Sequence, residues 1–277
     1  MQNKLRISAV VFTKDEESNI KECIDCLSHF SEVVVIDSMS VDSTCEIAAS
    51  QGARVTYFEW DGKYPKKRQW SLDNVHYSNE WILFIDADER VAEPFVNELR
   101  SFIQMASPSV GGASVPIEYY FAGKRLKFGQ KPRKTVLLRL GQAKYPVVRD
   151  LAAEGMGELE GHYQPLINGK VFRFKTGILH NDNDLISSWM TRHVKYANWE
   201  AHLLLNGDAK NVVDKSKGRF ASKLHKLPLK PLGFFFYSYI FKFGFFDGRA
   251  GFDYAFAKCW YYWLSGLIAR EKVLHDN

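Results

Sequence analysis

Apolar and polar blocks alternate along the first hundred residues and predict a regular succession of strands and helices. Apolar runs that predict strands are LRISAVVF (5–12), EVVVID (32–37), ARVTYF (53–58) and WILFI (81–85). Helical spacing of apolar residues lies between or after them, over 15–30, 44–50, 66–75 and from Pro94 onward. Strands that are apolar throughout, separated by helix-length crossovers, are typical of a buried parallel sheet covered on both faces.

The pattern changes from about residue 111. Shorter runs predict strands of an antiparallel or mixed section over 114–123, 124–129 and 135–140. A long amphipathic helix is predicted over 184–206, and it is followed by a basic stretch (210–230), an aromatic run (232–246) and a helical segment (251–271). We therefore expect an α/β domain over residues 1–208 and a helical, basic and aromatic-rich C-terminal extension over residues 209–277.

Composition excludes some classes but leaves the partner open. The chain has 277 residues, 46% hydrophobic and 25% charged, which is ordinary for a globular protein and excludes wholesale disorder or a disulfide scaffold. A net charge of +5 with 14% aromatic residues fits nucleic acid, a membrane surface or an anionic small molecule. No secretory signal and no apolar run of about 18 residues is present, so we expect a cytoplasmic location and reduced cysteines. Cys23 and Cys26 form a C-x-x-C inside a predicted helix, where a structural role is favoured.

Acidic residues follow two of the apolar strands directly. Asp37 ends the second strand, and Asp86 and Asp88 follow the fourth. In sheets of this kind the ligand site lies beyond the carboxyl ends of the strands. Two carboxylates spaced as D-x-D suit a divalent cation that also bridges phosphates. The alternative is that 86–89 only forms the polar start of the next helix.

Three classes of α/β protein place acids at this position. A dinucleotide-binding domain needs a glycine-rich turn after the first strand, and 12–17 contains no glycine. A phosphatase of the haloacid dehalogenase type also uses D-x-D, but that family usually has Thr or Val where Arg90 stands. The third class is a nucleotide-sugar glycosyltransferase.

Several separate segments resemble this third class, specifically the inverting family-2 glycosyltransferases of the GT-A fold. The segments are TKDEESNI (13–20), VIDSMSVDST (35–44), KRQWSL (67–72) and WILFIDADE (81–89). FFDGRAG (245–251) is similar to a late motif of small bacterial enzymes that act on lipopolysaccharide core. The chain departs from the family pattern at Asp15, Met39, Ser43 and Gln69, which puts the donor base and sugar in doubt more than the fold.

The resemblance implies a Rossmann-like, mostly parallel sheet flanked by helices, and it assigns roles to single residues. The nucleotide sugar falls to Thr13, Glu16, Asp37, Arg68 and Asp86. Mg²⁺ or Mn²⁺ falls to Asp88, Asp86 and His180, although a purely structural His180 is an open alternative. The expected reaction transfers a sugar, with inversion, from a nucleotide-diphosphate sugar to a glycolipid or oligosaccharide of lipopolysaccharide core or another cell-envelope glycan.

Inversion requires a carboxylate that deprotonates the acceptor hydroxyl. Glu154, Glu158 and Glu160 lie in a glycine-rich loop that could bring one over a bound donor. We select Glu158 as the catalytic base, acting with Asp88, while three solvated loop glutamates remain the alternative.

The aromatic extension leaves two interpretations open. Residues 210–249 hold nine Lys or Arg residues and a run of Phe and Tyr that is too short and too charged to span a bilayer. It fits peripheral binding to the cytoplasmic face of the inner membrane, or a helix packed on the catalytic domain. No nucleic-acid signature is present. Two rivals to a glycosyltransferase remain, a metal-dependent D-x-D phosphatase and a non-catalytic nucleotide-sugar-binding protein on a GT-A scaffold.

Overall fold

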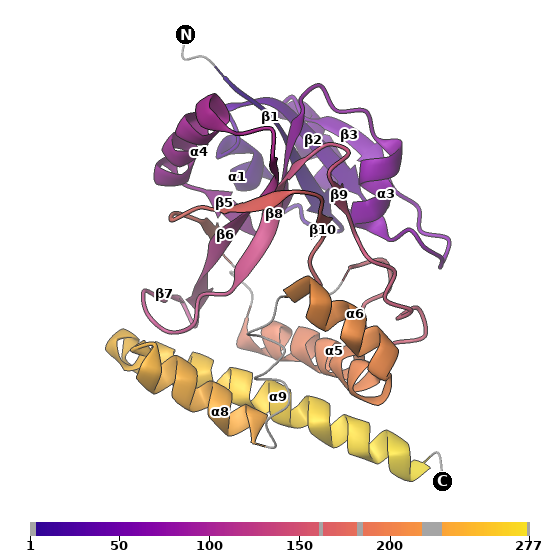
Figure 1. Ribbon diagram of the computed structural model, residues 1–277, viewed down its shortest axis with the longest axis vertical. Helices are drawn as coiled ribbons and strands as arrows, with labels where there is room; N and C mark the ends of the chain where they lie inside the picture. Colours follow the sequence, from indigo (N-terminus) through magenta and orange to yellow (C-terminus); the bar gives the residue numbers. More distant parts are fainter. Residues whose placement is uncertain (1–3, 161–162, 182–184, 218–228, 276–277) are drawn as a thin grey trace.

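A computed structural model describes residues 4–160, 163–181, 185–217 and 229–275. For residues 215–217 it describes the backbone alone. A curled sheet with helices on both faces forms the upper body, and a set of long helices lies beneath it (Figure 1). The first four long strands are β1 (Leu5–Thr13), β2 (Phe30–Asp37), β3 (Arg54–Tyr57) and β4 (Trp81–Asp86). They pair in parallel in the order β3-β2-β1-β4, which confirms the parallel section predicted from their apolar runs.

The sheet is mixed beyond β4. Its remaining strands are β5 (Glu89–Val91), β6 (Val110–Phe121), β7 (Lys124–Arg125), β8 (Arg133–Arg139), β11 (Lys170–Arg173) and β12 (Ile178–His180). The order continues β4-β8-β6-β12-β5, with β8 antiparallel to both of its neighbours. Two short strands, β9 (Ala143–Lys144) and β10 (Leu166–Ile167), pair separately. The α/β class is therefore confirmed, together with the mixed section expected after residue 111.

Alternation along β1 explains how both faces are covered. Ile7, Ala9 and Val11 pack in one core cluster with side chains of α1 (Ile20–Asp25), α2 (Thr44–Ser50) and α4 (Glu93–Met105). Val10 and Phe12 point the other way, into a second cluster that includes side chains of α3 (Lys67–Asn74) and of the helices after residue 185. Period-two alternation with both sets buried is what a central strand between two helical layers requires.

The first helix is much shorter than the helix predicted over 15–30. The backbone amides before it bond to the loop after β2 instead of forming a helical turn. The Asp15 amide donates to Ser40 Oγ at 2.8 Å, and the Glu16 amide donates to Thr44 Oγ1 at 2.7 Å. Asp15 also has a positive φ of 54°, which a right-handed helix does not allow. Tertiary hydrogen bonds thus override the local helical pattern.

The C-terminal part is helical, as predicted. It contains α5 (Ile186–Leu205), α6 (Gly207–Lys217), α8 (Lys230–Phe236), short turns over 237–241 and 244–247, and α9 (Arg249–His275). Figure 1 shows α8 and α9 side by side beneath α5. Ala209 and Val213 of α6 join the core cluster on the β-sheet, so the boundary proposed at residue 208 stays a prediction. Among the described helices, none combines the length and apolarity needed to cross a bilayer.

The late motif over 245–251 joins the extension to the loop between β7 and β8. The buried Asp247 carboxylate accepts hydrogen bonds from the backbone amides of Lys127 (3.0 Å) and Phe128 (2.8 Å). Gly251 lies so close to the Gly244 carbonyl that a Cβ at this position would overlap it. The motif is therefore explained by packing between two segments that are distant in sequence.

Asp247→Asn is expected to lower the free energy of unfolding by about 1–3 kcal/mol, because one of the two amides would then face an NH₂ group instead of an oxygen. Urea unfolding at pH 7 measures the change. The matched control is Asp253→Asn, whose side chain is 41% exposed and lies 3.7 Å from Arg249. Equal stabilities of the two variants would contradict the joining role.

Lys258 of α9 lies in an aromatic enclosure. Its Nζ is 5.7 Å from the ring centre of Trp189, 5.9 Å from that of Tyr254 and 5.7 Å from that of Tyr261. The same Nζ lies 3.2 Å from Nε2 of His193. Burial lowers the pKa of Lys258 to about 8. The charged form of the Lys258 side chain is therefore less favourable in the folded protein than in the unfolded chain.

Lys258→Met is expected to raise the free energy of unfolding at pH 7 by about 1–2 kcal/mol, the desolvation cost being partly offset by attraction to the rings. Since the folded pKa lies below the unfolded value of about 10.4, the cost is fully present below pH 8 and disappears as the pH rises toward 10. Wild-type stability should therefore gain over this range relative to the variant. Urea unfolding at pH 7 and pH 9.5 measures it, with Lys272→Met as control, and an unchanged difference between the two pH values would contradict the assignment.

Candidate active site

The predicted acidic residues meet at one edge of the sheet. In the strand register Thr13 lies opposite Asp37, and Phe12 lies opposite Asp86. These positions are the carboxyl ends of β2, β1 and β4, which are three neighbouring strands. The edge is the place where the ligand of such a sheet is expected.

Asp37 organises the turn that follows β2. Its buried carboxylate accepts hydrogen bonds from Thr13 Oγ1 (2.7 Å), the Ser40 amide (2.7 Å) and Ser40 Oγ (2.6 Å). Burial raises the pKa of Asp37, but the hydrogen bonds from Ser40 and Thr13 lower it more, so the pKa lies below its ordinary value. Thr13 and Asp37 are thus held together in one loop pair. Glu16 belongs to it through the hydrogen bond that its backbone amide donates to Thr44 Oγ1.

Two of the departures from the family pattern fall where the backbone is left-handed. Asp15 has φ of 54° and Met39 has φ of 57°. These are positions where the resemblance leads us to expect Asn and Gly, which adopt positive φ most readily. The turn is therefore retained in this chain in spite of a side chain that fits it less well.

Asp86 lies between two cationic side chains. Arg68 of α3 donates to its Oδ1 at 2.5 Å, and Lys134 of β8 donates to its Oδ2 at 3.1 Å. Lys134 also donates to Glu89 Oε1 at 2.7 Å, and Glu89 Oε2 accepts from the Asp86 amide at 3.0 Å. Burial raises the pKa of Asp86, but Arg68 and Lys134 outweigh it and hold that pKa well below its usual range. This carboxylate is therefore ionised.

Lys134 and Glu89 were not singled out by sequence reasoning. Burial raises the pKa of Glu89, whereas the pKa of Lys134 is held well above its ordinary value because Glu89 and Asp86 outweigh its own burial. The sequence signal for Glu89 was its place in the 81–89 motif. Lys134 was visible only as one of seven basic residues between Lys124 and Arg139, since nothing local reveals the β4–β8 pairing.

Asp88 and His180 face each other beside this cluster. β12 pairs with β5, and the Asn181 amide donates to the Asp88 carbonyl at 2.9 Å, which brings the two residues together. His180 Nδ1 lies 3.3 Å from Asp88 Oδ1, and both atoms are buried without a hydrogen bond of good geometry. Burial lowers the pKa of His180, but the Asp88 carboxylate raises it more, so the pKa lies above its ordinary value. The described residues contain no ready-made group of three His, Cys, Asp or Glu ligands for a metal.

The three candidate bases have different surroundings. Glu158 accepts a hydrogen bond from Ser38 Oγ, and its Oε1 lies 3.6 Å from Lys67 Nζ, close to the loop held by Asp37. Glu160 is buried, accepts from the Gln69 amide at 2.9 Å and has one oxygen without a partner. Burial raises the pKa of Glu160. Glu154 is exposed. Glu158 stays the predicted base.

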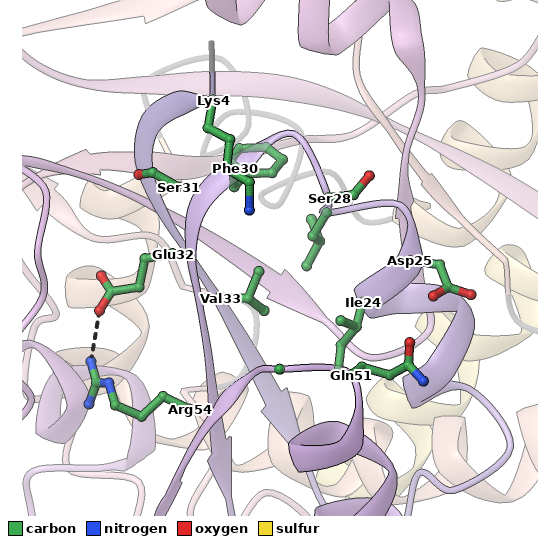
Figure 2. A pocket seen from close by; sticks show the side chains of 12 residues that line it. Lys4, Ile24, Asp25, Ser28, Phe30, Ser31, Glu32, Val33, Gln51 and Arg54 are labelled. Atoms are coloured by element: carbon green, nitrogen blue, oxygen red, sulfur yellow. Dashed lines mark hydrogen bonds and ion pairs between the residues drawn. The ribbon is translucent and has the colours of Figure 1, made fainter. Parts of the chain in front are cut away.

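Two further features lie away from this edge. A hollow of about 520 Å³ opens at the amino ends of β1, β2 and β3, where Glu32 pairs with Arg54 (Figure 2). It therefore lies at the edge of the sheet opposite to the acidic cluster.

Cys23 and Cys26 are free thiols, the first within α1 and the second at its C-terminus. The Val91 amide donates to Cys26 Sγ at 3.3 Å, which agrees with a structural role.

Lys134→Met is expected to lower the free energy of unfolding by about 2–4 kcal/mol, because it leaves the buried Glu89 and the neighbouring Asp86 without their shared cation. Chemical unfolding at pH 7 measures this change. The double variant Glu89→Gln/Lys134→Met should recover part of the loss. Lys131→Met removes a half-buried pair with Glu118, whose carboxylate keeps its pair with Arg125. It is the control and should change stability by less than about 1 kcal/mol. A loss as small as that for Lys134→Met would contradict the account of the cluster.

Comparison with known proteins agrees with this geometry. Residues 8–145 match the family model described as glycosyl transferase family 2. The lipopolysaccharide core biosynthesis glycosyltransferase LpsC of Rhizobium meliloti is 26% identical over 91% of this chain and 90% of its own length. A glycosyltransferase of Rickettsia bellii is 38% identical over 34% of this chain, and the match spans only 31% of that relative.

Two solved structures illustrate a partial similarity to this chain. Glucosyl-3-phosphoglycerate synthase from Mycobacterium tuberculosis, in complex with Mn²⁺, uridine diphosphate and phosphoglyceric acid, has a TM-score of 0.41 and 19% identity, covering 73% of this chain and 78% of that one. S. aureus TarS has a TM-score of 0.42 and 16% identity, covering 82% of this chain and 47% of its own.

The sheet topology and the acids at its carboxyl edge define an α/β domain with a ligand site at that edge. The match to the family model identifies the family of this domain. The chain belongs to the family-2 glycosyltransferases, with the family domain over residues 8–145.

Proposed function

We propose that the protein transfers a sugar from a nucleotide-diphosphate sugar to a glycolipid or saccharide acceptor of the cell envelope, with inversion and with a divalent cation. The observation that carries the proposal is the cluster of Asp86, Asp88 and His180 at the carboxyl edge of the family domain. The acceptor class is suggested by the similarity to LpsC, a lipopolysaccharide core biosynthesis glycosyltransferase that aligns over nearly the whole chain. Peripheral association with the cytoplasmic face of the inner membrane follows from a lipid-linked acceptor.

The donor set at this edge fits a divalent cation. Asp88 Oδ1 and His180 Nδ1 form a buried pair 3.3 Å apart without a hydrogen bond of good geometry. The carboxylate, and the imidazole once it has lost its proton, are suitable ligands for Mg²⁺ or Mn²⁺. When bound, the cation would neutralise the charge that develops on a departing nucleoside diphosphate. Asp86, already paired with Arg68 and Lys134, would contribute from the first position of the D-x-D motif.

The chain's own cations would assist at the same place. Arg68 and Lys134 lie at the acidic edge and would shift part of their interaction from Asp86 to the diphosphate when the donor binds. Thr13, Glu16 and Asp37, in the neighbouring loop pair, would hold the base and ribose. A diphosphate in this position is therefore surrounded by groups that stabilise negative charge.

The acceptor hydroxyl must attack from the side opposite to the leaving group. A carboxylate, predicted to be Glu158, would take its proton, and a single displacement would give a β-linked product from an α-linked donor. The sugar and base of the donor are left open by these contacts.

The experiment that tests the proposal is a thermal-shift screen of nucleotide sugars with and without Mn²⁺. A donor that binds at a hundredfold excess over its Kd should stabilise the folded protein by about 2.7 kcal/mol, and the shift should require Mn²⁺. Stabilisation by phosphomonoesters instead would favour the phosphatase alternative. Stabilisation by a nucleotide sugar with no turnover of any envelope glycolipid would favour the non-catalytic binding protein.

A further inference from the structure

The outward face of α9 is apolar along most of its length. Its exposed apolar residues follow one another at intervals of four and seven, which places them on a single stripe. Their exposed fractions are Phe252 42%, Phe256 58%, Trp263 49%, Leu267 39% and Leu274 77%. The opposite face of the same helix, including Tyr254 and Tyr261, is buried toward α5. One side of α9 thus packs on the protein, and the other exposes an apolar stripe.

This stripe continues without a break onto the segment before α9. Phe252 contacts Phe256 and Phe235, with ring centres 6.1 and 5.6 Å apart. From Phe235 the ring contacts run through Tyr239 to Phe245. The surface is completed by Phe243 and Phe246 in the turns before α9 and by Phe128 in the loop between β7 and β8. We call the exposed members of this set, together with the α9 stripe, the aromatic face.

Basic side chains border the aromatic face. Lys127, Lys242, Arg249 and Arg270 are exposed beside it, and the Arg249 side chain is 94% exposed. Of the acidic residues in this region, Asp247 is buried and bonded to backbone amides, and Asp253 lies 3.7 Å from Arg249. Glu271 is exposed next to Arg270, so four basic side chains stand against two acidic ones at the surface. The edge of the face is therefore positively charged on balance.

We infer that the aromatic face is a docking surface for an anionic lipid bilayer, on which α8 and α9 lie flat in the headgroup layer. Aromatic side chains flanked by Lys and Arg are the composition that binds this layer. A second copy of the chain is disfavoured as the occupant, because a symmetric contact would bring the two basic borders together. The inference rests on the proposed function only for the acceptor, since docking itself depends on this surface alone.

Docking in this orientation sets the height of the active site above the membrane. His180 contacts Tyr119 at a ring distance of 5.2 Å, and Tyr119 contacts Tyr254 on the inner side of α9 at 5.8 Å. The aromatic face lies across the width of α9, about 10 Å, from Tyr254. The candidate metal site therefore lies at most roughly 20 Å above the headgroup layer. An acceptor that reaches it carries its accepting sugar close to its lipid anchor.

The test is flotation of the full-length protein with vesicles of phosphatidylethanolamine and phosphatidylglycerol, compared with phosphatidylcholine vesicles. The protein should float with the anionic vesicles, and the double variant Phe256→Ser/Trp263→Ser should reduce the partition coefficient at least about tenfold. Met105→Ser removes an apolar side chain on α4 that is more exposed than either of these (78% against 58% and 49%), and it should leave the partition coefficient unchanged. Circular dichroism verifies that each variant is folded.

Three results would overturn the inference. They are absence of the folded wild-type protein from anionic vesicles, equal flotation of the double variant, and a change of the double variant from oligomer to monomer with vesicle binding unaltered. None of these measurements uses the reaction, so each is separable from the proposed activity. A protein that floats as expected but binds no nucleotide sugar in the thermal-shift screen would refute the proposed function and leave the docking surface standing.

Discussion

An Asp88→Asn enzyme is expected to lose sugar transfer by about a thousandfold while remaining folded. Asp88 Oδ1 is buried, faces His180 Nδ1 at 3.3 Å and has no hydrogen bond of its own. An amide in its place keeps the shape but removes the charge that would bind the cation. The measurements are the transfer rate at saturating donor and the Mn²⁺-dependent thermal shift, and both should be lost together.

Asp25→Asn provides the matched control, because this carboxylate forms an exposed pair with Lys21 on α1. It should retain the wild-type rate and the wild-type thermal shift. If Asp88→Asn kept transfer within about threefold of wild type, Asp88 would not be the metal-holding residue, since a lost oxyanion stabiliser alone costs more than a hundredfold.

Glu158→Gln is expected to lower the rate of transfer by a factor of about 10²–10⁴, the usual contribution of a general base, with donor binding retained. The glutamine can still accept the hydrogen bond from Ser38 that the carboxylate accepts now, so the loop should keep its place. Rates at saturating donor and acceptor measure the loss of chemistry, and a thermal shift with donor and Mn²⁺ measures binding.

The other two glutamates of the loop supply the comparison. Glu154→Gln changes an exposed side chain and should have no effect. Near-normal transfer by Glu158→Gln would refute its role as the base. A large loss in Glu160→Gln would then assign the role to Glu160, whose raised pKa and unpartnered oxygen fit proton removal.

Much of the fold could be predicted because its first half follows simple rules. Strands such as β2 and β4 are apolar throughout, and only a sheet covered on both faces buries them. The helix predicted over 15–30 was too long, because amides of Asp15 and Glu16 bond to side chains 25 and 28 residues away. Such bonds leave no trace in local periodicity.

The candidate site could be predicted in part for a similar reason. Asp37 and Asp86 directly follow apolar strands, so the topology of a parallel sheet brings them to one edge. Lys134 reaches Asp86 only through the antiparallel pairing of β8 with β4. The role of Asp247 was also hidden, since its partners lie about 120 residues earlier in the chain. Contacts made by non-local strand pairing and loop docking are beyond a reading of motifs and spacing.

The most direct test of the central claim is ³¹P nuclear magnetic resonance of the purified protein with a nucleotide sugar selected by thermal shift, envelope glycolipids and Mn²⁺. The account predicts that the two donor phosphorus signals are replaced by those of a free nucleoside diphosphate while the glycolipid gains the sugar. Asp88→Asn should leave the donor signals unchanged over the same time. Inorganic phosphate as the released product, or a donor that remains intact with every glycolipid tested, would contradict the account.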